Sequence, residues 1–424
     1  MQLMKQKFFR LIADLRFAIF ILFLIINASI IGTIIEQDQP IEIYKINYPL
    51  TNPVFGILTW DQIIKFGFDH MYKTWWFFSL ISLFAISLIS CTFLQQLPSL
   101  KIARRSQFFR TTKPFYRLKV STVLNRFSFT KLLLDLTKNE YSIFQQKNTI
   151  YCYKGLIGRI APIVVHFSII LILLGTIIGS LFGFKAQEII PKTEIFHVQN
   201  ILNNGQLTVI PKTSSRINDF WITYTTDKTI AQFYSDMSII DNKGNEIIRK
   251  TVSVNYPLIY KNVYYYQTDW NLIGLRFQNQ EREIVEYPLL NILNKRAKVW
   301  LTSISNTYSS NKRMVAIIDN LEGYCSIYNE NGEFLGNLEL NETINFQKIV
   351  TFLEIISSTG LQIKIDPGIP VIYLGFFFLI LSTLISYITY SQIWIVQNDK
   401  KIFIGGNTNR ATFEFELEFF KIIK

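Results

Sequence analysis

Three histidines occur in this chain of 424 residues: His70, His166 and His197. His166 lies in a stretch that carries no charge between Arg159 and Lys185. An ionisable side chain in so apolar a stretch is costly and usually faces a partner or a cavity. A neutral imidazole there can ligate haem iron or relay protons, or it can hydrogen-bond a hydroxyl or carbonyl of a neighbouring helix. The residues alone leave these alternatives open.

The other candidate residues fit structural roles more readily than chemical ones. His70 lies just before an aromatic-rich apolar run, where it is either a ligand at the membrane surface or an interfacial polar residue. His197 is expected to be an ordinary domain residue. Asp366 precedes Pro367 and Gly368, a combination typical of a rigid turn and helix start, which leaves a functional role for its carboxylate open.

Four apolar runs are each long enough to cross a membrane, which takes about 20 residues of helix. They span residues 17–35, 75–94, 160–184 and 367–396. The first run is too long for a cleavable signal peptide, and no small-residue cleavage site follows it. The expected fold is a polytopic α-helical membrane protein in which His166 lies on the third span, about 10 Å along the helix from Arg159.

Positive charge is concentrated between the second and third spans. Residues 97–160 carry thirteen Lys and Arg against two acids, or +11 of the chain's formal net charge of +12. Residues 36–74 carry five acids against three lysines. The positive-inside rule therefore predicts that 97–160 and both termini lie on the cytoplasmic or stromal side. Nucleic-acid binding is disfavoured, because no nucleic-acid motif accompanies the charge.

The segments between the spans predict two soluble units. Residues 185–366 are rich in β-branched and aromatic residues and contain hairpin signals such as Asn331-Gly332, which predicts a large β-rich lumenal or extracytoplasmic domain, sandwich-like or barrel-like. The patterns within 97–159 predict a small α/β unit on the inner side. Residues 1–96 hold the first two spans, and 397–424 is expected to be a stromal or cytoplasmic tail.

Several classes of protein are excluded by motifs that the sequence lacks. Cys91, Cys152 and Cys325 fall in three different expected environments, so no disulfide framework is predicted. There is no C-x-x-C-H, no nucleophile elbow, no phosphate-binding loop and no dinucleotide fingerprint. The spans contain one His and no Asp, Glu, Lys or Arg, which disfavours an ion-coupled transporter.

Taken together, several stretches resemble the CcsB/ResB family in its plastid and cyanobacterial form. The strongest is "GRIAPIVVHFSIILILLGTIIGSLFGFKAQE" at residues 158–188. The others are "LIADLRFAIFILFLIINASIIGTIIEQ" at 11–37, the second span with its flanks at 69–105, "RINDFWITYT" at 216–225, "QFYSDMSIID" at 232–241, "YYQTDW" at 265–270 and "DPGIPVIYLGFFFLILSTLISY" at 366–387. The stretch between about 271 and 360 contributes nothing to the resemblance.

The resemblance implies a subunit of the system II cytochrome c maturation machinery, not an enzyme by itself. It implies a plastid thylakoid location, or alternatively a cyanobacterial membrane. It further implies that the chain works with CcsA to carry haem b across the membrane and attach it to apocytochromes c, namely cytochrome f and a soluble lumenal c-type cytochrome. His166 matches the family's axial ligand to membrane-buried haem. The rival hypothesis is a structural scaffold that holds CcsA and apocytochrome without binding haem.

Overall fold

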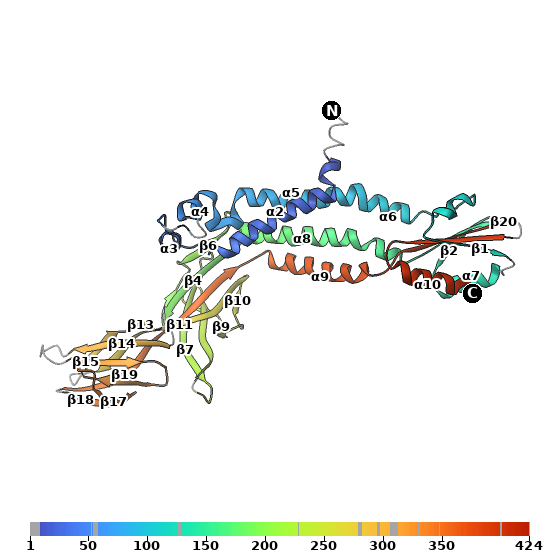
Figure 1. The fold of residues 1–424 in the computed structure, drawn as a ribbon. Coiled ribbons are helices and arrows are strands. Elements are labelled where there is room, and N and C mark those ends of the chain that lie inside the picture. The colour runs from blue at the N-terminus through green and yellow to red at the C-terminus, as the bar shows by residue number, and fades with distance from the viewer. Residues whose placement is uncertain are drawn as a thin grey trace. The chain divides into compact units, whose positions relative to one another are not determined.

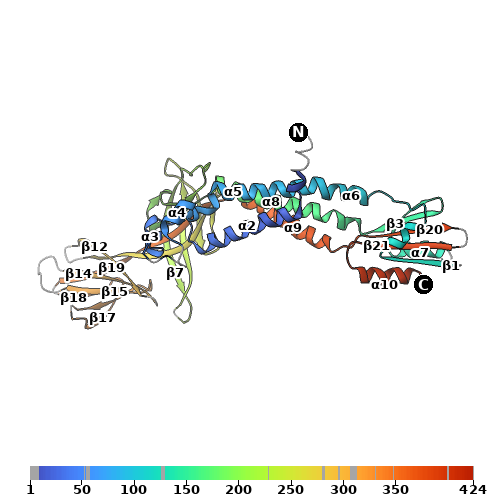
Figure 2. The same cartoon turned by 45° about the horizontal axis from the view of Figure 1, so that its top comes forward.

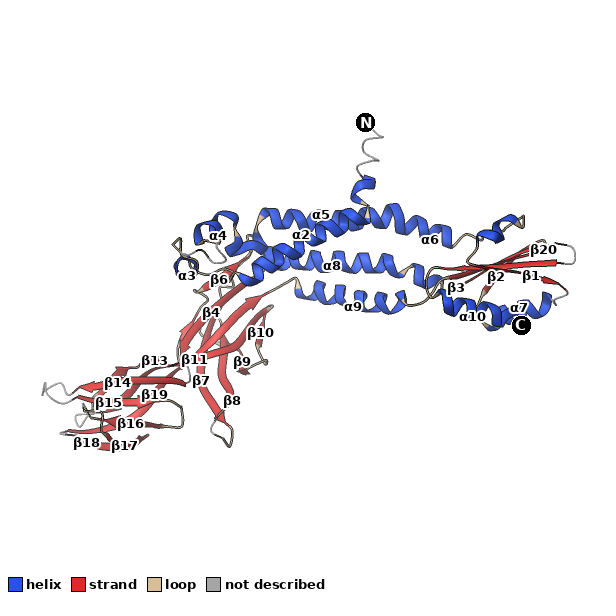
Figure 3. Cartoon of the chain, viewed as in Figure 1, coloured by secondary structure: helices blue, strands red, loops and turns tan. Residues whose placement is uncertain are grey.

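The computed structural model describes residues 9–423 except 52, 54–57, 126–128, 228, 279–281, 295–296, 306–312, 330, 347 and 399–400. The chain forms two compact units. One comprises Met1–Ser180 and Gly368–Lys424, and the other comprises Leu181–Pro367. Figure 1 shows the elements in chain order, and Figure 3 shows that helices dominate the first unit and strands the second.

Among the described residues, four helices are long and apolar enough to cross a membrane. They are α2 (Leu15–Ile34), the second span at Trp75–Ala103, α8 (Ala161–Phe182) and α9 (Ile369–Ser386). Only 11–22% of each apolar window is buried within the chain, so most of the helix surface is left for lipid or a partner. Figures 1 and 2 show the spans running side by side. The predicted four-span architecture is confirmed.

The second span changes its helical type near one end. It consists of α5 (Trp75–Cys91), a π-helical segment (Thr92–Gln96) and α6 (Leu97–Ala103), and is therefore longer than the predicted 75–94. Pro98 supplies the cause, because it has no N–H to donate and its ring disturbs the preceding turn. The amide of Leu97 consequently bonds to the carbonyl of Thr92, five residues back. Such π segments are frequent at functional sites.

Small residues allow α8 and α9 to pack closely. Ser168 and Gly175 are buried on α8, and Gly375 and Ser382 are buried on α9. A Cβ added at Gly175 would lie 2.7 Å from the side chain of Ile372. These small residues form the contact face between the two helices, and larger side chains there would push the helices apart.

Two predicted boundaries near the C-terminus are wrong. The fourth span was expected to continue to residue 396, but α9 ends at Ser386 and a strand follows it, β20 (Ser391–Asn398). Ile393 and Ile395 enter one hydrophobic core, while Trp394 enters another on the opposite face of the sheet. A strand buried on both faces has a continuous apolar sequence, which composition alone does not distinguish from a membrane helix.

The predicted tail at 397–424 is also wrong, because it completes the α/β unit. Its elements are β1 (Val120–Asn125), α7 (Phe129–Lys138), β2 (Ser142–Gln146), β3 (Thr149–Lys154), β21 (Lys401–Thr408) and α10 (Thr412–Ile423), together with β20. The antiparallel sheet has the order β1-β21-β20-β3-β2. Leu132 of α7 and Phe419 of α10 are fully buried in one core with Ile393. The small α/β unit is therefore built from two distant parts of the chain.

A group of short helices connects the first two spans. It comprises α3 (Ile41–Asn47), α4 (Trp60–Phe66) and a 3₁₀ turn (Phe68–Lys73). Buried Tyr44 and Ile63 form its small core with Ile35 at the end of α2. Two further 3₁₀ turns, Lys113–Arg117 and Leu156–Arg159, flank the α/β unit.

The second unit is antiparallel throughout its described pairings. Its strands are β4 (Phe184–Pro191), β5 (Ile195–Phe196), β6 (Ile201–Asn204), β7 (Ser214–Tyr224), β8 (Ile230–Ile240), β9 (Glu246–Ser253), β10 (Leu258–Tyr260), β11 (Val263–Gln278), β12 (Ile284–Pro288), β13 (Leu290–Asn294), β14 (Ala297–Ser305), β15 (Arg313–Ile318), β16 (Tyr324–Tyr328), β17 (Phe334–Glu339), β18 (Thr343–Phe346) and β19 (Lys348–Ile365). The long strands β11 and β19 pair along most of their length.

Two hydrophobic cores lie along β11 and β19. The ends of these strands nearer the fourth span, with Tyr265 and Ile363, pack against Met237 of β8 and its neighbours. Their far ends contribute Phe277 and Phe352 to a second core with the β13–β17 sheet. This layered arrangement confirms the predicted β-rich domain. The stretch without family resemblance in the sequence supplies most of the second core.

Candidate functional site

His166 lies near the start of α8, half-buried against the second span. Its Nδ1 lies 2.9 Å from Oγ1 of Thr92, the first residue of the π-helical segment. The Thr92 hydroxyl donates its single proton to the carbonyl of Leu88, at 2.8 Å. Its oxygen therefore accepts from His166, and the network assigns the proton of the neutral imidazole to Nδ1. Nε2 keeps its lone pair and is the atom available to bind a metal.

Two hydrogen bonds fix the segment before α2 to the helix that carries Thr92. The hydroxyl of Ser87 donates to the carbonyl of Ile12 at 2.7 Å, and Nε2 of Gln95 donates to the carbonyl of Ala13 at 2.7 Å. Ile12, Ala13 and Ser87 are buried. These bonds hold the π-helical segment from the side away from solvent, so the partner of His166 sits on a fixed support.

A polar pocket of about 320 Å³ lies at the end of the spans next to the α/β unit. It is lined by Gln95, Pro98, Ser99, Ile102, Ala103, Gln107, Arg159, Tyr390 and Gln392. The guanidinium of Arg159 lies over the ring of Tyr390, 5.0 Å from its centroid. Nε of Arg159 is buried without a hydrogen-bond partner, and no carboxylate of the described residues pairs with this side chain. The sequence interpretation used Arg159 only as a charge at the membrane boundary.

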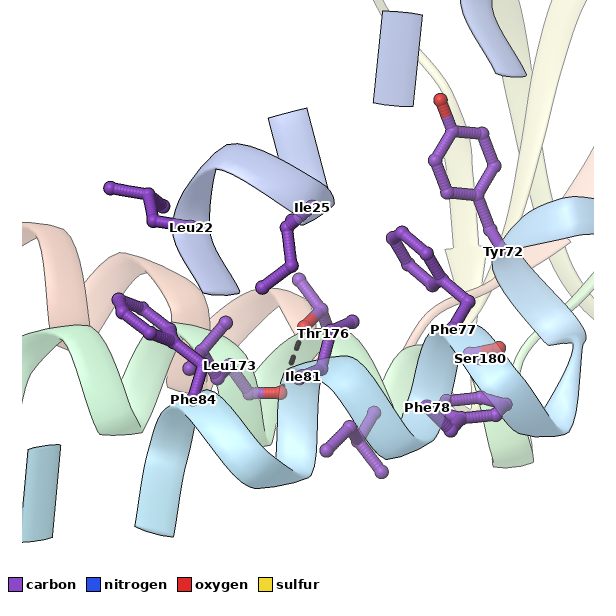
Figure 4. Close-up of a pocket in the computed structure, with 11 residues that line it drawn as sticks. Leu22, Ile25, Tyr72, Phe77, Phe78, Ile81, Phe84, Leu173, Thr176 and Ser180 are labelled. Carbon is purple, nitrogen blue, oxygen red and sulfur yellow. Dashed lines mark hydrogen bonds between the residues drawn. The ribbon is translucent and has the colours of Figure 1, made fainter. Parts of the chain in front are cut away.

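A second pocket, of about 420 Å³, is apolar and lies between α2, α5 and α8. Figure 4 shows the side chains around it, including Ile25, Phe84 and Leu173. The Thr176 hydroxyl donates a hydrogen bond to the carbonyl of Leu173 at 2.8 Å, as the dashed line in Figure 4 marks. No histidine, cysteine, carboxylate or basic side chain lines this pocket. It can hold hydrocarbon.

His70 lies beyond the end of the second span opposite to Thr92. About 17 residues of helix, or roughly 25 Å, separate Thr92 from the start of α5. His70 is 47% exposed, and its Nδ1 lies 2.8 Å from Oδ2 of Asp69. The structure therefore does not bring His70 and His166 to one site. Both remain candidate ligands by their chemistry alone.

The remaining candidates occupy ordinary positions. Asp366 lies 3.3 Å from Nζ of Lys364, directly before the turn that starts α9. His197 is exposed, with Nε2 at 2.9 Å from Nε2 of Gln199. Across the part of the chain that the structure describes, no group of three or more His, Cys, Asp and Glu side chains could hold a metal ion.

The sequence matches the ResB-like family over residues 15–310 and 323–420. The chain belongs to this family. It is 73% identical over 421 residues to the cytochrome c biogenesis protein Ccs1 of Phaeodactylum tricornutum, covering 99% of this chain and all of that protein. It is 42% identical to Ccs1 of Porphyra purpurea over 97% of this chain and 94% of that one.

A cyanobacterial relative extends the same pattern. The cytochrome c biogenesis protein CcsB of Microcystis aeruginosa is 41% identical, over 99% of this chain and 95% of its own length. The resemblance to the CcsB/ResB family is thereby confirmed. Among solved structures, the cytochrome c haem lyase CcmF is 10% identical with a TM-score of 0.24, covering 77% of this chain and 43% of that one. So low a score supports no conclusion about a shared fold.

Proposed function

We propose that this chain is the membrane subunit that holds haem during its delivery and attachment to apocytochromes c. Its place in the ResB-like family, with relatives named as cytochrome c biogenesis proteins, supports a role in the biogenesis of c-type cytochromes. The haem-binding step rests on one observation. His166 lies within a span, and Thr92 holds its Nδ1 and leaves Nε2 for a ligand. That is the arrangement of an axial ligand whose other nitrogen is anchored.

A partner is needed to complete such a site. His166 would supply one ligand to the haem iron, and a second ligand would have to come from elsewhere. The other two histidines of the chain lie elsewhere, His70 beyond the far end of the second span and His197 in the other unit. Most of the span surface is unburied within this chain. A multi-span partner such as CcsA would supply the second ligand and cover this surface, so the chain acts as part of a haem-attachment complex and not as an enzyme by itself.

The charge distribution supports an orientation. The strongly basic segment at 97–160 is expected on the stromal or cytoplasmic side, and the β-rich unit is then expected in the thylakoid lumen or its bacterial equivalent. His166 then lies in the stromal half of the bilayer, on the side from which haem is supplied. The apocytochromes, including cytochrome f and a soluble lumenal c-type cytochrome, would be met on the lumenal side.

The decisive experiment is the His166→Ala variant copurified with CcsA. Alanine removes the ligand and leaves a space that free imidazole can enter, so haem content and cytochrome c maturation should both fall and both recover in part with added imidazole. His70→Ala is the matched control and should retain haem. Wild-type haem content and normal maturation in His166→Ala would refute the proposal. A scaffold without haem predicts normal haem content in both variants and defects that follow protein level alone.

A further inference from the structure

We propose that the pocket at Arg159 binds the propionate carboxylates of the haem that His166 ligates. The proposal rests on the function proposed for His166 and assigns the acidic edge of the haem to a particular cation. Its basis is that the part of the second span which contacts His166 also lines a polar pocket, and that this pocket holds the buried, unpartnered Nε of Arg159.

Two elements connect the iron ligand to the pocket. On one side, Arg159 is the last residue of the 3₁₀ turn before α8, and His166 lies seven residues further along the chain. On the other, Thr92 contacts His166, and Gln95 and Ser99 line the pocket three and seven residues further along. The pocket therefore begins on the same stretch of the second span that holds Nδ1 of His166. A flat molecule bound at Nε2 would direct one edge towards this pocket.

The propionates of haem need a polar, positively charged site. Its macrocycle is apolar, but its two propionates are carboxylates on one edge, and an unpaired carboxylate at membrane depth is strongly disfavoured. A guanidinium is the best side chain for a carboxylate, because its N–H groups form parallel charge-assisted hydrogen bonds. The volume of about 320 Å³ has room for carboxylate arms and several waters.

Arg159 is the lining residue with hydrogen-bonding capacity to spare. Nε2 of Gln95 already donates to the carbonyl of Ala13, and Nε2 of Gln392 donates to the hydroxyl of Tyr151. The Tyr390 hydroxyl donates to the carbonyl of Ala103 at 2.9 Å. Burial, followed by its hydrogen bond with Tyr151, raises the pKa of Tyr390, so its ring is a neutral platform beneath the cation.

Close backbone packing fixes Arg159 in this position. A Cβ on Gly158 would clash with the carbonyl of Ile388, and one on Gly155 would clash with that of Thr389. Gly155 also has a φ of +73°, which favours glycine. The turn before Arg159 therefore lies directly against the segment that carries Tyr390. A cation held in this way needs little reordering when an anion arrives.

The test compares two ligands that differ only in the propionates. The full chain, copurified with CcsA and stripped of haem, is titrated with haem and with haem dimethyl ester, and the Soret absorption is followed. Wild type should prefer haem by about tenfold or more. Arg159→Gln should weaken haem binding about tenfold and leave ester binding unchanged, while Arg159→Lys should keep part of the preference. Arg104→Gln removes an exposed charge nearby and should behave as wild type.

The outcomes separate this inference from the function on which it rests. Equal weakening of haem and ester in Arg159→Gln, or an undiminished preference for haem, would refute a propionate site while leaving haem binding dependent on His166. Equal binding of both ligands by His166→Ala and wild type would refute the proposed function itself. A phosphate headgroup has similar chemistry. If Arg159→Gln loses retention of phosphatidylglycerol and the haem-to-ester preference of wild type persists in it, the pocket belongs to lipid and the inference is wrong.

Discussion

Thr92 accepts a hydrogen bond from Nδ1 of His166 at 2.9 Å, and the two residues come from different membrane spans. The contact joins the start of α8 to the point where the second span becomes π-helical. The Thr92 hydroxyl donates its own proton to the carbonyl of Leu88, so its oxygen can only accept from the imidazole. This fixes both the orientation of the His166 ring and Nδ1 as a nitrogen that carries a proton. Thr92 therefore positions the imidazole of His166.

We predict that Thr92→Val weakens haem binding about tenfold or more, as is usual for the loss of a hydrogen bond behind a metal-ligating histidine. Valine keeps the shape of threonine but cannot accept a hydrogen bond from Nδ1 of His166. Thr92→Ser keeps the hydroxyl and should restore most of the affinity. Absorption titration of the complex with haem measures both. If Thr92→Val binds haem as tightly as wild type, Thr92 has no positioning role.

The contact between α8 and α9 predicts a cost for any large side chain at Gly175. Leucine there would overlap Ile372 and the backbone of Gly368, so Gly175→Leu should lower the free energy of unfolding by about 1–3 kcal/mol or separate the two helices. Thermal unfolding in detergent reports the change. Leu174→Ala alters a residue that is 48% exposed and should have little effect. Similar stabilities for Gly175→Leu and wild type would contradict the close packing.

The charge distribution predicts that Ser106 and Asn242 lie on opposite sides of the membrane. Single cysteines at these positions, in a chain whose own cysteines are replaced, should react with a membrane-impermeant maleimide from opposite faces of sealed vesicles. Both positions are exposed, so access is not limited by folding. Labelling of both from the same face would overturn the four-span topology.

Cys325 is predicted to be chemically inert. It is fully buried in the core along β11 and β19, and burial raises the pKa of its thiol from 9.0 to about 12. The folded state therefore holds this proton more tightly than the unfolded state. Its contribution to the free energy of unfolding is constant below pH 9 and is lost as the pH rises from 9 towards 12.

Two measurements check this property of Cys325. A maleimide at pH 8 should label it only after unfolding, since the thiolate is the reactive form. Cys325→Ala should leave cytochrome c assembly intact at a cost of about 1 kcal/mol in stability. Rapid labelling of the folded chain, or lost assembly at normal protein level, would show a thiol function.

Local signals were enough to predict the elements whose partners are close in sequence. The spans follow from apolar length, and the hairpin of β16 and β17 follows from Asn331-Gly332, because that turn pairs the strands on either side of it. The contact of Gly175 with α9 follows from the spacing of small residues on one helix face. In each case one segment carries the whole signal.

Features that depend on two distant segments were missed, because neither segment alone carries the signal. β20 pairs with β3 across two spans and the whole of the β-rich unit, and only that pairing distinguishes the sequence "QIWIV" from membrane helix. Nothing in the sequence around Thr92 identifies it as the partner of His166, because hydroxyl side chains are common within spans. In the sequence, Arg159 resembles any basic residue at a membrane boundary, and only the fold brings the ring of Tyr390 beneath its guanidinium. Its position seven residues before His166 was the signal that sequence reasoning could have used.

The order of strands in the α/β unit has a consequence for biosynthesis. β20 and β21 occupy the middle of its sheet, between β1 and β3, yet they are synthesised after the other three strands. Until α9 has inserted in the correct direction, β1 and β3 lack their neighbours and expose unpaired edges, which attract proteases and other chains. Completion of this sheet therefore requires that α8 and α9 together return the chain to the side where β1 and β3 lie, and a chain whose last helix fails to insert leaves these edges exposed.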